Sequence, residues 1–193
     1  MGHILYRDIS ENNTIKTDPE KADGFKGMLI DLDLAKEVDI GRSGARHRTG
    51  TMEFMAIEVL LGYSHTYRHD LESFFYVLIW QCARRGWGEE RPKDSLLTKW
   101  YTGSYREIAN AKFGNMSKSE TAGLAFENIL DEFPPLFDCV KPLCRTIRDI
   151  LFPYENGLFI GTPSDPEKLY GPTIKAFDDA IAEMKAGETE ISP

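Results

Sequence analysis

The chain has 193 residues, of which 41% are hydrophobic and 11% aromatic. This is the composition of a globular protein, and the length suits one domain with a sizeable core. The formal net charge of −8 argues against nucleic acids and anionic membranes as partners. The longest uncharged apolar run, residues 74–83, is too short to cross a bilayer. No signal peptide opens the chain and its three cysteines match no metal-ligand spacing, so we expect an intracellular location, cytoplasmic or nuclear.

The hydrophobic pattern predicts a mainly α-helical fold with a few short β-strands. Short strands are expected at residues 3–8, 13–17 and 26–32, before a charged, glycine-punctuated segment at 36–51. Beyond that segment, the periodicity predicts helices at residues 71–82, 93–112, 118–132, 143–152 and 173–186.

Two of these helices carry more detailed predictions. Residues 71–82 are apolar at all but three positions, so that helix should be buried around most of its circumference. The last helix should follow an irregular stretch, because three prolines lie between residues 163 and 172. Its predicted apolar face comprises Ile174, Phe177, Ala180, Ile181 and Met184.

The first chemical motif lies near the start of the chain. Tyr6, Arg7 and Asp8 are followed by Asn13, five positions after the aspartate. This spacing resembles the catalytic loop of protein kinases, in which an aspartate receives the proton of the attacking hydroxyl and an asparagine holds a metal ion. Alone the pattern is weakly specific, because Asp8 can equally cap a turn and Asn13 can be an ordinary loop residue.

Three further blocks follow this motif along the chain. Asp31 comes after an apolar, strand-like run in residues 28–36, MLIDLDLAK. Residues 50–58 read GTMEFMAIE, and Asp70 lies twelve positions beyond Glu58 in HDLESFFYVLIW. Four blocks in this order are far more specific than any one of them.

Together the four blocks resemble the catalytic loop, metal-binding aspartate, A-P-E segment and central helix start of protein kinases. The variant is similar to the fungal-type protein kinase family, which has a D-I-S-x-x-N loop, a D-x-D metal motif and an H-D-L-E-S helix start. The resemblance implies a single protein-kinase-like C-terminal lobe over residues 1–193. Its parts would be a catalytic loop at 5–13, a metal motif at 31–33, an activation segment at 31–58 and a helical subdomain at 70–186.

The resemblance assigns the chemistry to three residues. Asp8 would accept or orient the attacking hydroxyl of a serine or threonine in a protein substrate. Asn13 and Asp31 would be the metal ligands, supplying oxygen atoms to Mg²⁺ and thereby binding the phosphates of ATP. All three are therefore catalytic candidates.

Other residues would have regulatory or structural roles. Arg7 would face the activation segment, where a phosphate on Thr49 or Ser43 would form a charge-assisted pair with it. Thr51 would hydrogen-bond to the catalytic aspartate.

The resemblance gives the two acidic residues further along the chain structural roles. Glu58 would pair with a distal arginine, for which Arg145 and Arg148 are the candidates. Asp70 would anchor the backbone of the catalytic loop.

Departures from the kinase pattern bear on activity. Ser10 stands where serine/threonine kinases have a lysine, and Asp33 replaces the glycine of the D-F-G motif. The residues ahead of the loop contain no glycine-rich phosphate loop and no lysine strand, so the N-lobe is absent from this chain. We therefore expect half an ATP site, and weak or absent catalysis by this chain alone.

Two other classes of function compete with a kinase. One is a non-catalytic, kinase-like module, a pseudokinase or regulatory fragment that binds another protein. The other is a metal-dependent enzyme of unrelated fold, suggested by the pair Asp31 and Asp33. No glycine follows at position 36, so the calcium-loop pattern fails, and no nucleotide-binding strand–helix unit supports a glycosyltransferase.

The resemblance also bears on assembly. In kinases a long apolar helix precedes the catalytic loop and packs against the central helix, and this chain does not encode it. An apolar patch should then be uncovered on the central helix, comprising Phe74, Phe75, Val77, Leu78 and Trp80. We expect the C-terminal helix, a second copy in a homo-oligomer or a partner protein to cover it.

Overall fold

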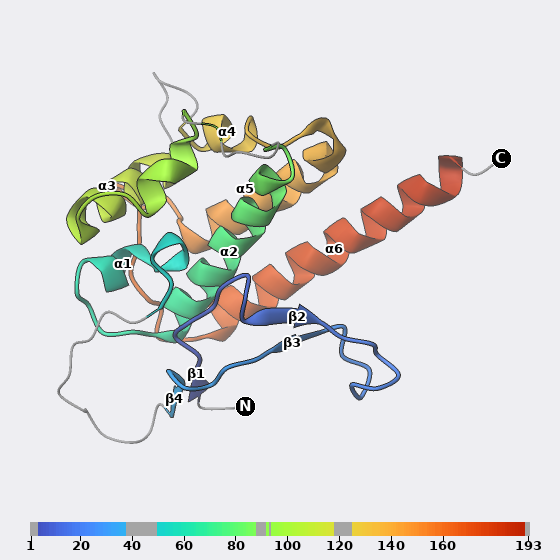
Figure 1. The fold of residues 1–193 in the computed structure, drawn as a ribbon, viewed down its shortest axis with the longest axis horizontal. Coiled ribbons are helices and arrows are strands. Elements are labelled where there is room, and N and C mark those ends of the chain that lie inside the picture. Colours follow the sequence, from blue (N-terminus) through green and yellow to red (C-terminus); the bar gives the residue numbers. More distant parts are fainter. Residues whose placement is uncertain (1–3, 38–49, 88–91, 93, 118–124, 192–193) are drawn as a thin grey trace.

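The computed structural model describes residues 4–37, 50–87, 92, 94–117 and 125–191. Most of these residues are helical and the strands are few and short, which confirms the predicted mainly α-helical fold. Figure 1 shows the helices gathered in one body, with the strands below them and the last helix projecting to one side. No described helix is long and apolar enough to span a membrane.

The strands form two separate two-stranded sheets. β1 (Ile4–Leu5) pairs antiparallel with β4 (Lys36–Glu37). β2 (Thr14–Lys16) pairs antiparallel with β3 (Gly27–Leu29), and Ile15 lies opposite Met28. The predicted strands are present but shorter than expected, and β4 was not expected. A two-stranded ribbon is only marginally stable by itself, so each of these ladders stays short.

The central helix confirms its predicted burial. A short 3-10 helix η1 (Met52–Phe54) and the single-turn α1 (Ile57–Leu60) lead into α2 (Tyr67–Arg84). Twelve of the eighteen residues of α2 are buried, including charged ones in its first turns. This helix is therefore a central core element, against which η1, α4 and α5 pack.

The helix expected at 93–112 is divided. η2 (Leu96–Trp100) is a 3-10 helix, and α3 (Tyr105–Met116) begins after Gly103, whose φ is +103°. Ser104 and Glu107 form a capping box that starts α3: the Ser104 hydroxyl accepts the N–H of Glu107, and Glu107 accepts the N–H of Ser104. The prediction of one continuous helix over 93–112 was therefore wrong, because the capping box starts a new helix although the apolar periodicity continues through it.

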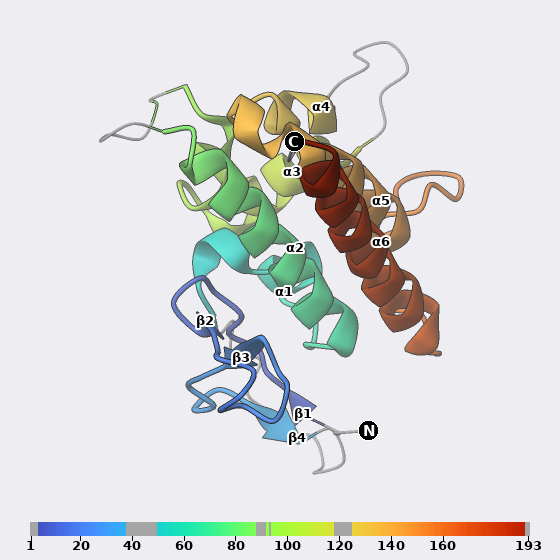
Figure 2. The same ribbon diagram turned by 90° about the vertical axis from the view of Figure 1, so that its right-hand side faces the viewer.

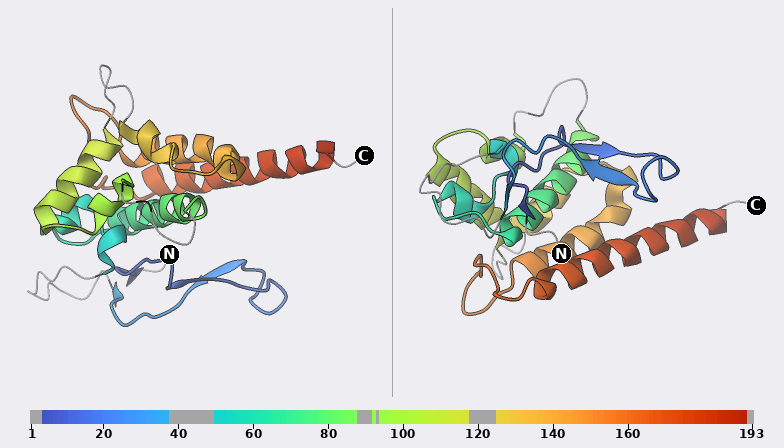
Figure 3. Two further views of the ribbon diagram at one scale, coloured as in Figure 1. Left: turned by 45° about the horizontal axis from the view of Figure 1, so that its top comes forward. Right: turned by 90° about the horizontal axis from the view of Figure 1, so that it is seen from below.

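The remaining helices complete the body. They are α4 (Ala125–Leu130), η3 (Pro135–Val140), α5 (Lys141–Leu151) and α6 (Glu167–Ile191). Only the second half of the helix predicted at 118–132 can be compared, since 118–124 lie outside the described residues. Figure 2 shows α6 running alongside α5, and α5 also packs against α2. The two views of Figure 3 show α6 extending well beyond the rest of the body.

The last helix begins earlier than predicted. It starts at Glu167, and Pro172 lies inside it. Tyr170 stacks on Tyr67 with ring centroids 5.7 Å apart, and Leu169 is buried. These contacts hold the first turns although a proline donates no backbone hydrogen bond.

The buried face of α6 agrees with the prediction in part. Ala180 is buried, and Phe177 and Met184 are partly buried against the core, as predicted. Ile174 and Ile181 are exposed, at 58% and 47% of their surface, and the smaller Thr173 and Ala176 are buried instead. Small residues let a helix approach its neighbour closely, and they shift the contact face away from the isoleucines.

The predicted uncovered patch on the central helix is mostly covered. Phe75, Val77 and Trp80 are buried, whereas Phe74 is 37% exposed. Phe75 packs against Phe126 of α4 with ring centroids 5.9 Å apart, and the ring of Trp80 meets that of Phe54 edge-on at 5.7 Å. The short elements η1 and α4 thus supply part of the cover, and α6 packs mainly along α5.

Candidate functional site

Asp8 is held from two sides. Thr51 donates two hydrogen bonds to Asp8 Oδ1, from its backbone N–H at 2.9 Å and from its hydroxyl at 3.2 Å. The amide of Asn13 donates to Asp8 Oδ2 at 3.1 Å and to the Asp8 carbonyl at 3.0 Å. Since both carboxylate oxygens accept hydrogen bonds, the Asp8 side chain is fixed in one orientation.

A glycine allows the segment ahead of Thr51 to approach the loop. Gly50 has a φ of +109°, which side-chain-bearing residues rarely adopt. A Cβ at this position would lie 2.8 Å from the carbonyl oxygen of Arg7. Any other residue would therefore push Thr51 away from Asp8.

Asp70 holds the backbone that precedes Asp8. It accepts the N–H of Tyr6 at 2.8 Å and the N–H of Arg7 at 2.9 Å. His65 Nε2 lies 2.8 Å from the same carboxylate. Arg7 has a φ of +72°, an unfavourable conformation for a residue with a side chain. The buried carboxylate of Asp70 therefore stabilises a strained turn.

The far side of the loop is tied to α2. Glu11 accepts hydrogen bonds from Gln81 at 2.6 Å and from Arg84 at 2.8 and 2.9 Å. Ser10 is buried, and its hydroxyl accepts the N–H of Asn13 at 3.3 Å. Ser10 therefore braces the turn from inside the loop.

The β2–β3 hairpin brings Asp31 toward this loop. The N–H of Ile30 donates to the carbonyl of Asn13 at 3.0 Å, and the Tyr6 hydroxyl donates to the Ile30 carbonyl. Asp31 itself has a φ of +64°, and its Oδ1 accepts the N–H of Asp33 at 3.2 Å. The residue after Ile30 is thereby turned out of the strand direction.

Negative charge gathers around the Tyr6 hydroxyl. Burial raises the pKa of Tyr6, and the carboxylates of Asp31, Asp8 and Asp70 raise it further. Three carboxylates therefore lie close enough to one phenol to disfavour its ionised form. A cation bound beside them would relieve their mutual repulsion.

The donor set fits a magnesium ion. The Asn13 amide N–H group is engaged with Asp8, which directs the amide oxygen elsewhere as an acceptor. Asp31 is exposed and supplies a carboxylate. Among the described residues, no three or more His, Cys, Asp or Glu side chains are grouped to hold a metal. Mg²⁺ suits such an open pair, because it binds through one or two protein oxygens and completes its shell with phosphates and water.

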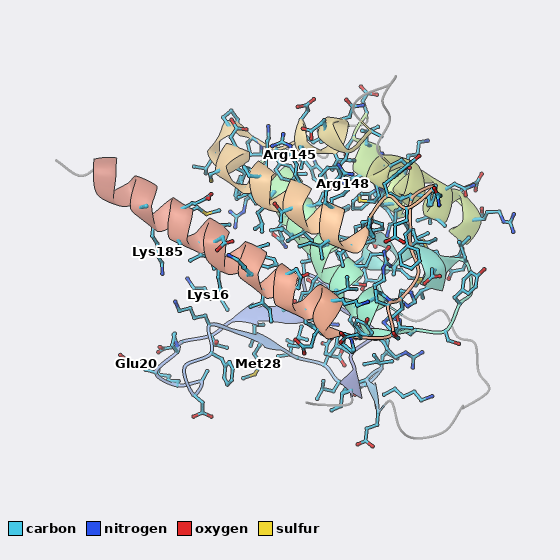
Figure 4. All side chains as sticks on the ribbon, turned by 180° about the vertical axis from the view of Figure 1, so that it is seen from behind. Lys16, Glu20, Met28, Arg145, Arg148 and Lys185 are labelled. Atoms are coloured by element: carbon cyan, nitrogen blue, oxygen red, sulfur yellow. The ribbon has the colours of Figure 1, made fainter. Side chains whose placement is uncertain are left out.

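The hairpin beside these residues presents apolar side chains to solvent. The exposed set, which we name the apolar hairpin surface, comprises Ile15, Phe25, Met28, Ile30 and Leu32. Figure 4 shows Met28 on the hairpin, which lies on the other side of α6 from Arg145 and Arg148 in that view. Exposed apolar groups gathered on a short ribbon are typical of a binding surface.

The predicted partner of Glu58 was wrong. Glu58 Oε2 lies 2.9 Å from Nε2 of His69, in the first turn of α2. Arg145 is paired instead with Glu127 of α4, at 2.6 and 2.8 Å, and Arg148 lies 3.1 Å from Asp149. The histidine is only eleven residues away in sequence, so α2 brings it to Glu58 directly. Thr49 and Ser43 lie outside the described residues.

Sequence reasoning missed a buried charged pair. Arg68 donates to Glu72 and, at 2.7 Å, to the carbonyl of Leu151 at the end of α5. Glu72 also accepts the N–H of Ile57 at 2.8 Å and the hydroxyl of Tyr76 at 2.7 Å. Burial alone would raise the pKa of Glu72, but the charge of Arg68 and these hydrogen bonds hold it below its ordinary value. Arg68 and Glu72 are four residues apart, and this i, i+4 spacing could have indicated the pair from sequence.

Comparison with known proteins bears on this arrangement. The model of a family described as fungal protein kinase matches residues 1–82. A curated protein of Dictyostelium discoideum, described as a probable serine/threonine-protein kinase, is 29% identical over 107 residues. The match covers 55% of this chain and 23% of that protein, so the chain spans less than a quarter of its relative's length.

Both matches are to protein kinases, which is the class of protein that the spacing of the loop around Asp8 indicates. Within that class, the chain is related to the fungal-type protein kinases. The family match ends at Cys82, near the end of α2, and includes every predicted site residue from Arg7 to Asp70.

Proposed function

We propose that this chain forms the C-terminal lobe of a protein kinase. The family activity would be ATP- and Mg-dependent phosphoryl transfer to serine or threonine of a protein substrate. The observation that supports the proposal is the fixed orientation of Asp8 between Thr51 and Asn13, with Asp31 following Ile30, whose N–H donates to the carbonyl of Asn13.

The residues act by position and charge. Asp8 receives the proton of the substrate hydroxyl, and its orientation by Thr51 keeps an oxygen directed at that hydroxyl. Asn13 and Asp31 hold the metal through their side-chain oxygens. Mg²⁺, when bound, neutralises charge that develops on the transferring phosphate. Asp33 stands beside this position where the family pattern has glycine, and it stiffens the backbone there.

The chain by itself supplies one side of an ATP site. Asn13 and Asp31 offer two oxygen ligands. The apolar hairpin surface offers exposed side chains against which a nucleotide base or a second lobe can pack. Neither Asn13 nor Asp31 carries a positive charge. The negative charge on the phosphates would therefore be balanced by the metal and by groups from another part of the protein. We therefore infer that this chain alone binds Mg-ATP weakly and transfers phosphate weakly or not at all.

A non-catalytic, kinase-like module is the second candidate function. The same apolar hairpin surface favours it, because a protein partner would cover those side chains as well as a lobe would. In either function the partner is a protein rather than nucleic acid, and the location is inside the cell. Self-association through Phe74 and its neighbours on α2 stays a prediction, which light scattering on the intact chain would test.

A chimera tests the catalytic proposal. The glycine-loop and lysine-strand half of a fungal-type protein kinase is joined ahead of residue 4, and transfer of radiolabelled phosphate to a mixed serine/threonine peptide is measured. We expect transfer by the chimera and a loss of about 10²- to 10⁴-fold in Asp8→Asn, because the proton acceptor is gone. Glu20→Gln, on the exposed turn of the hairpin, is the matched control.

Two results separate the candidate functions. A folded chimera that transfers phosphate equally well with Asp8→Asn contradicts the role of Asp8. A folded chimera that transfers none favours the non-catalytic module.

A further inference from the structure

Lys112 is a fully buried charged side chain on α3. Its Nζ donates hydrogen bonds to three backbone carbonyls, those of Met55 at 2.7 Å, Glu53 at 2.9 Å and Met52 at 3.4 Å. All three acceptors belong to one short stretch, η1 and the residue after it. A carbonyl that points inward at the end of such a short helix needs a donor from elsewhere, and Lys112 provides it.

The lysine is enclosed by aromatic rings. Its Nζ lies 4.3 Å from the ring centroid of Tyr76 and 5.4 Å from that of Trp100. Aromatic faces attract a cation, and attract it more strongly where water is excluded. Tyr76 in turn donates its hydroxyl to Glu72, so the lysine and the Arg68–Glu72 pair belong to one buried network.

The hydrogen bonds indicate which protonation state the structure describes. An ammonium group has three N–H donors, whereas a neutral amine has two. Three carbonyl acceptors therefore match the charged lysine. A neutral amine can donate to only two of the three carbonyls, and the 3.4 Å contact to Met52 is the weakest of the three.

The stretch held by Lys112 adjoins Thr51, the residue that orients Asp8. The N–H of Phe54 donates to the Thr51 carbonyl at 2.9 Å, and the N–H of Met55 donates to the Met52 carbonyl at 3.3 Å. These bonds make residues 51–55 one compact turn. A shift of the carbonyls that Lys112 holds would therefore move Thr51.

We propose that Lys112 is a positioning residue, which fixes the turn at residues 51–55 and thereby holds Thr51 against Asp8. This inference rests on the proposed function only for the chemistry given to Asp8. The contact itself exists whether or not the chain takes part in phosphate transfer.

The position of Lys112 makes the contact sensitive to pH. Burial lowers the pKa of Lys112 to about 7, against the opposing influence of Glu72 on α2 and Glu53 on η1. Glu58 of the adjacent α1 is engaged with His69. As pH rises through about 7, the third hydrogen bond is lost and the turn at 51–55 loosens.

The effect on global stability has the opposite sign. The ordinary pKa of a lysine side chain is 10.5, so between about pH 7 and 10.5 the unfolded chain binds more protons at Lys112 than the folded one. The lysine therefore contributes a stability that increases with pH in this window, while the local contact weakens. Local opening and global unfolding should thus move in opposite directions.

Amide hydrogen exchange tests the proposal without nucleotide. In Lys112→Met, an apolar side chain of similar length occupies the same space beside Tyr76 and Trp100, and all three carbonyls lose the hydrogen bond from Nζ. We expect the Thr51 N–H, which is bonded to Asp8, to exchange at least about tenfold faster, while amides of α5 keep their rates. Arg106→Met, an exposed cation on the same helix, is the control and should change neither. Unchanged exchange at Thr51 in a folded Lys112→Met protein would overturn the proposal.

A titration of the unmodified chain covers the case in which the variant fails to fold. The Lys112 side chain is followed by NMR between pH 6 and 9, together with protection of the Thr51 amide corrected for its intrinsic exchange rate. We expect that protection to fall as Lys112 loses its proton. Protection that stays constant across the titration of Lys112 would overturn the proposal. Since neither measurement involves ATP, failure here is distinguishable from failure of phosphate transfer in the chimera.

Discussion

The β2–β3 hairpin and the turn at residues 51–55 both border Asp8, and they are held in opposite ways. The turn is fixed from inside the protein by Lys112, and Glu72 holds the N–H of Ile57 just beyond it. The hairpin touches the loop through the N–H of Ile30 and leaves its apolar side chains in solvent. The helical side of the site is therefore fixed by contacts within the chain, whereas the hairpin side leaves apolar surface exposed.

The charges follow the same division. Beside the turn, the buried charges of Lys112, Arg68 and Glu72 each have a partner of opposite sign or several hydrogen bonds, as buried ions require. Beside the hairpin, Asp31 and Asp33 are exposed and their mutual repulsion is screened by water. Charge on this side is available to a ligand.

The largest expected effect is on the hairpin side, in an active form of the protein such as the chimera. Asp31→Asn should lower phosphate transfer by about 10²- to 10⁴-fold, because an amide is a poorer ligand for Mg²⁺ than a carboxylate. Its thermal unfolding should be nearly unchanged, since the side chain is exposed. Asp33→Gly serves as the comparison and should keep transfer or raise it slightly. Full activity in Asp31→Asn would remove the metal-ligand role.

The largest expected effect on stability is on the helical side. Arg68→Met should lower the free energy of unfolding by about 3–5 kcal/mol, because it leaves the buried carboxylate of Glu72 without its cation. Urea denaturation gives the value. Arg145→Met breaks the half-exposed pair with Glu127 and should cost less than about 1 kcal/mol. Similar losses of unfolding free energy in the two variants would show that the buried Arg68–Glu72 pair stabilises the protein no more than the half-exposed pair does.

Substitutions on the apolar hairpin surface should have the smallest effect on the free energy of unfolding. Ile15 and Met28 face each other across the ribbon, and both are more than a third exposed. Replacing both by threonine should change the free energy of unfolding by no more than about 0.5 kcal/mol, as for other exposed positions. Calorimetry checks this. A loss of several kcal/mol would mean that the hairpin packs against its own chain.

Much of the site could be predicted from sequence because its spacing is local or follows a recognisable order. Asp8 and Asn13 lie in one turn, and the hairpin that follows brings the next strand, and with it Asp31, beside them. The fungal kinase relationship and the mainly α-helical fold could likewise be read from motifs and periodicity. The start of α3 was also readable, since Gly103 and the Ser104–Glu107 capping box mark it.

The rest depends on contacts between distant residues. A lysine on an amphipathic helix is expected in solvent, and only the close approach of α3 to η1 turns Lys112 inward. His69 caps the start of α2 by accepting the N–H of Thr66 at 3.0 Å, and the other nitrogen of its ring reaches Glu58, which precedes that helix. Such pairings depend on how short elements pack, which periodicity does not encode.

We propose that this chain supplies one side of an ATP site and that tight binding of the nucleotide needs a second part. Isothermal titration calorimetry with Mg-ATP measures this on the chain as it is and on the chimera. We expect a Kd weaker than about 1 mM for the chain and one between about 1 µM and 1 mM for the chimera. A Kd in the low micromolar range for the chain alone would contradict the claim.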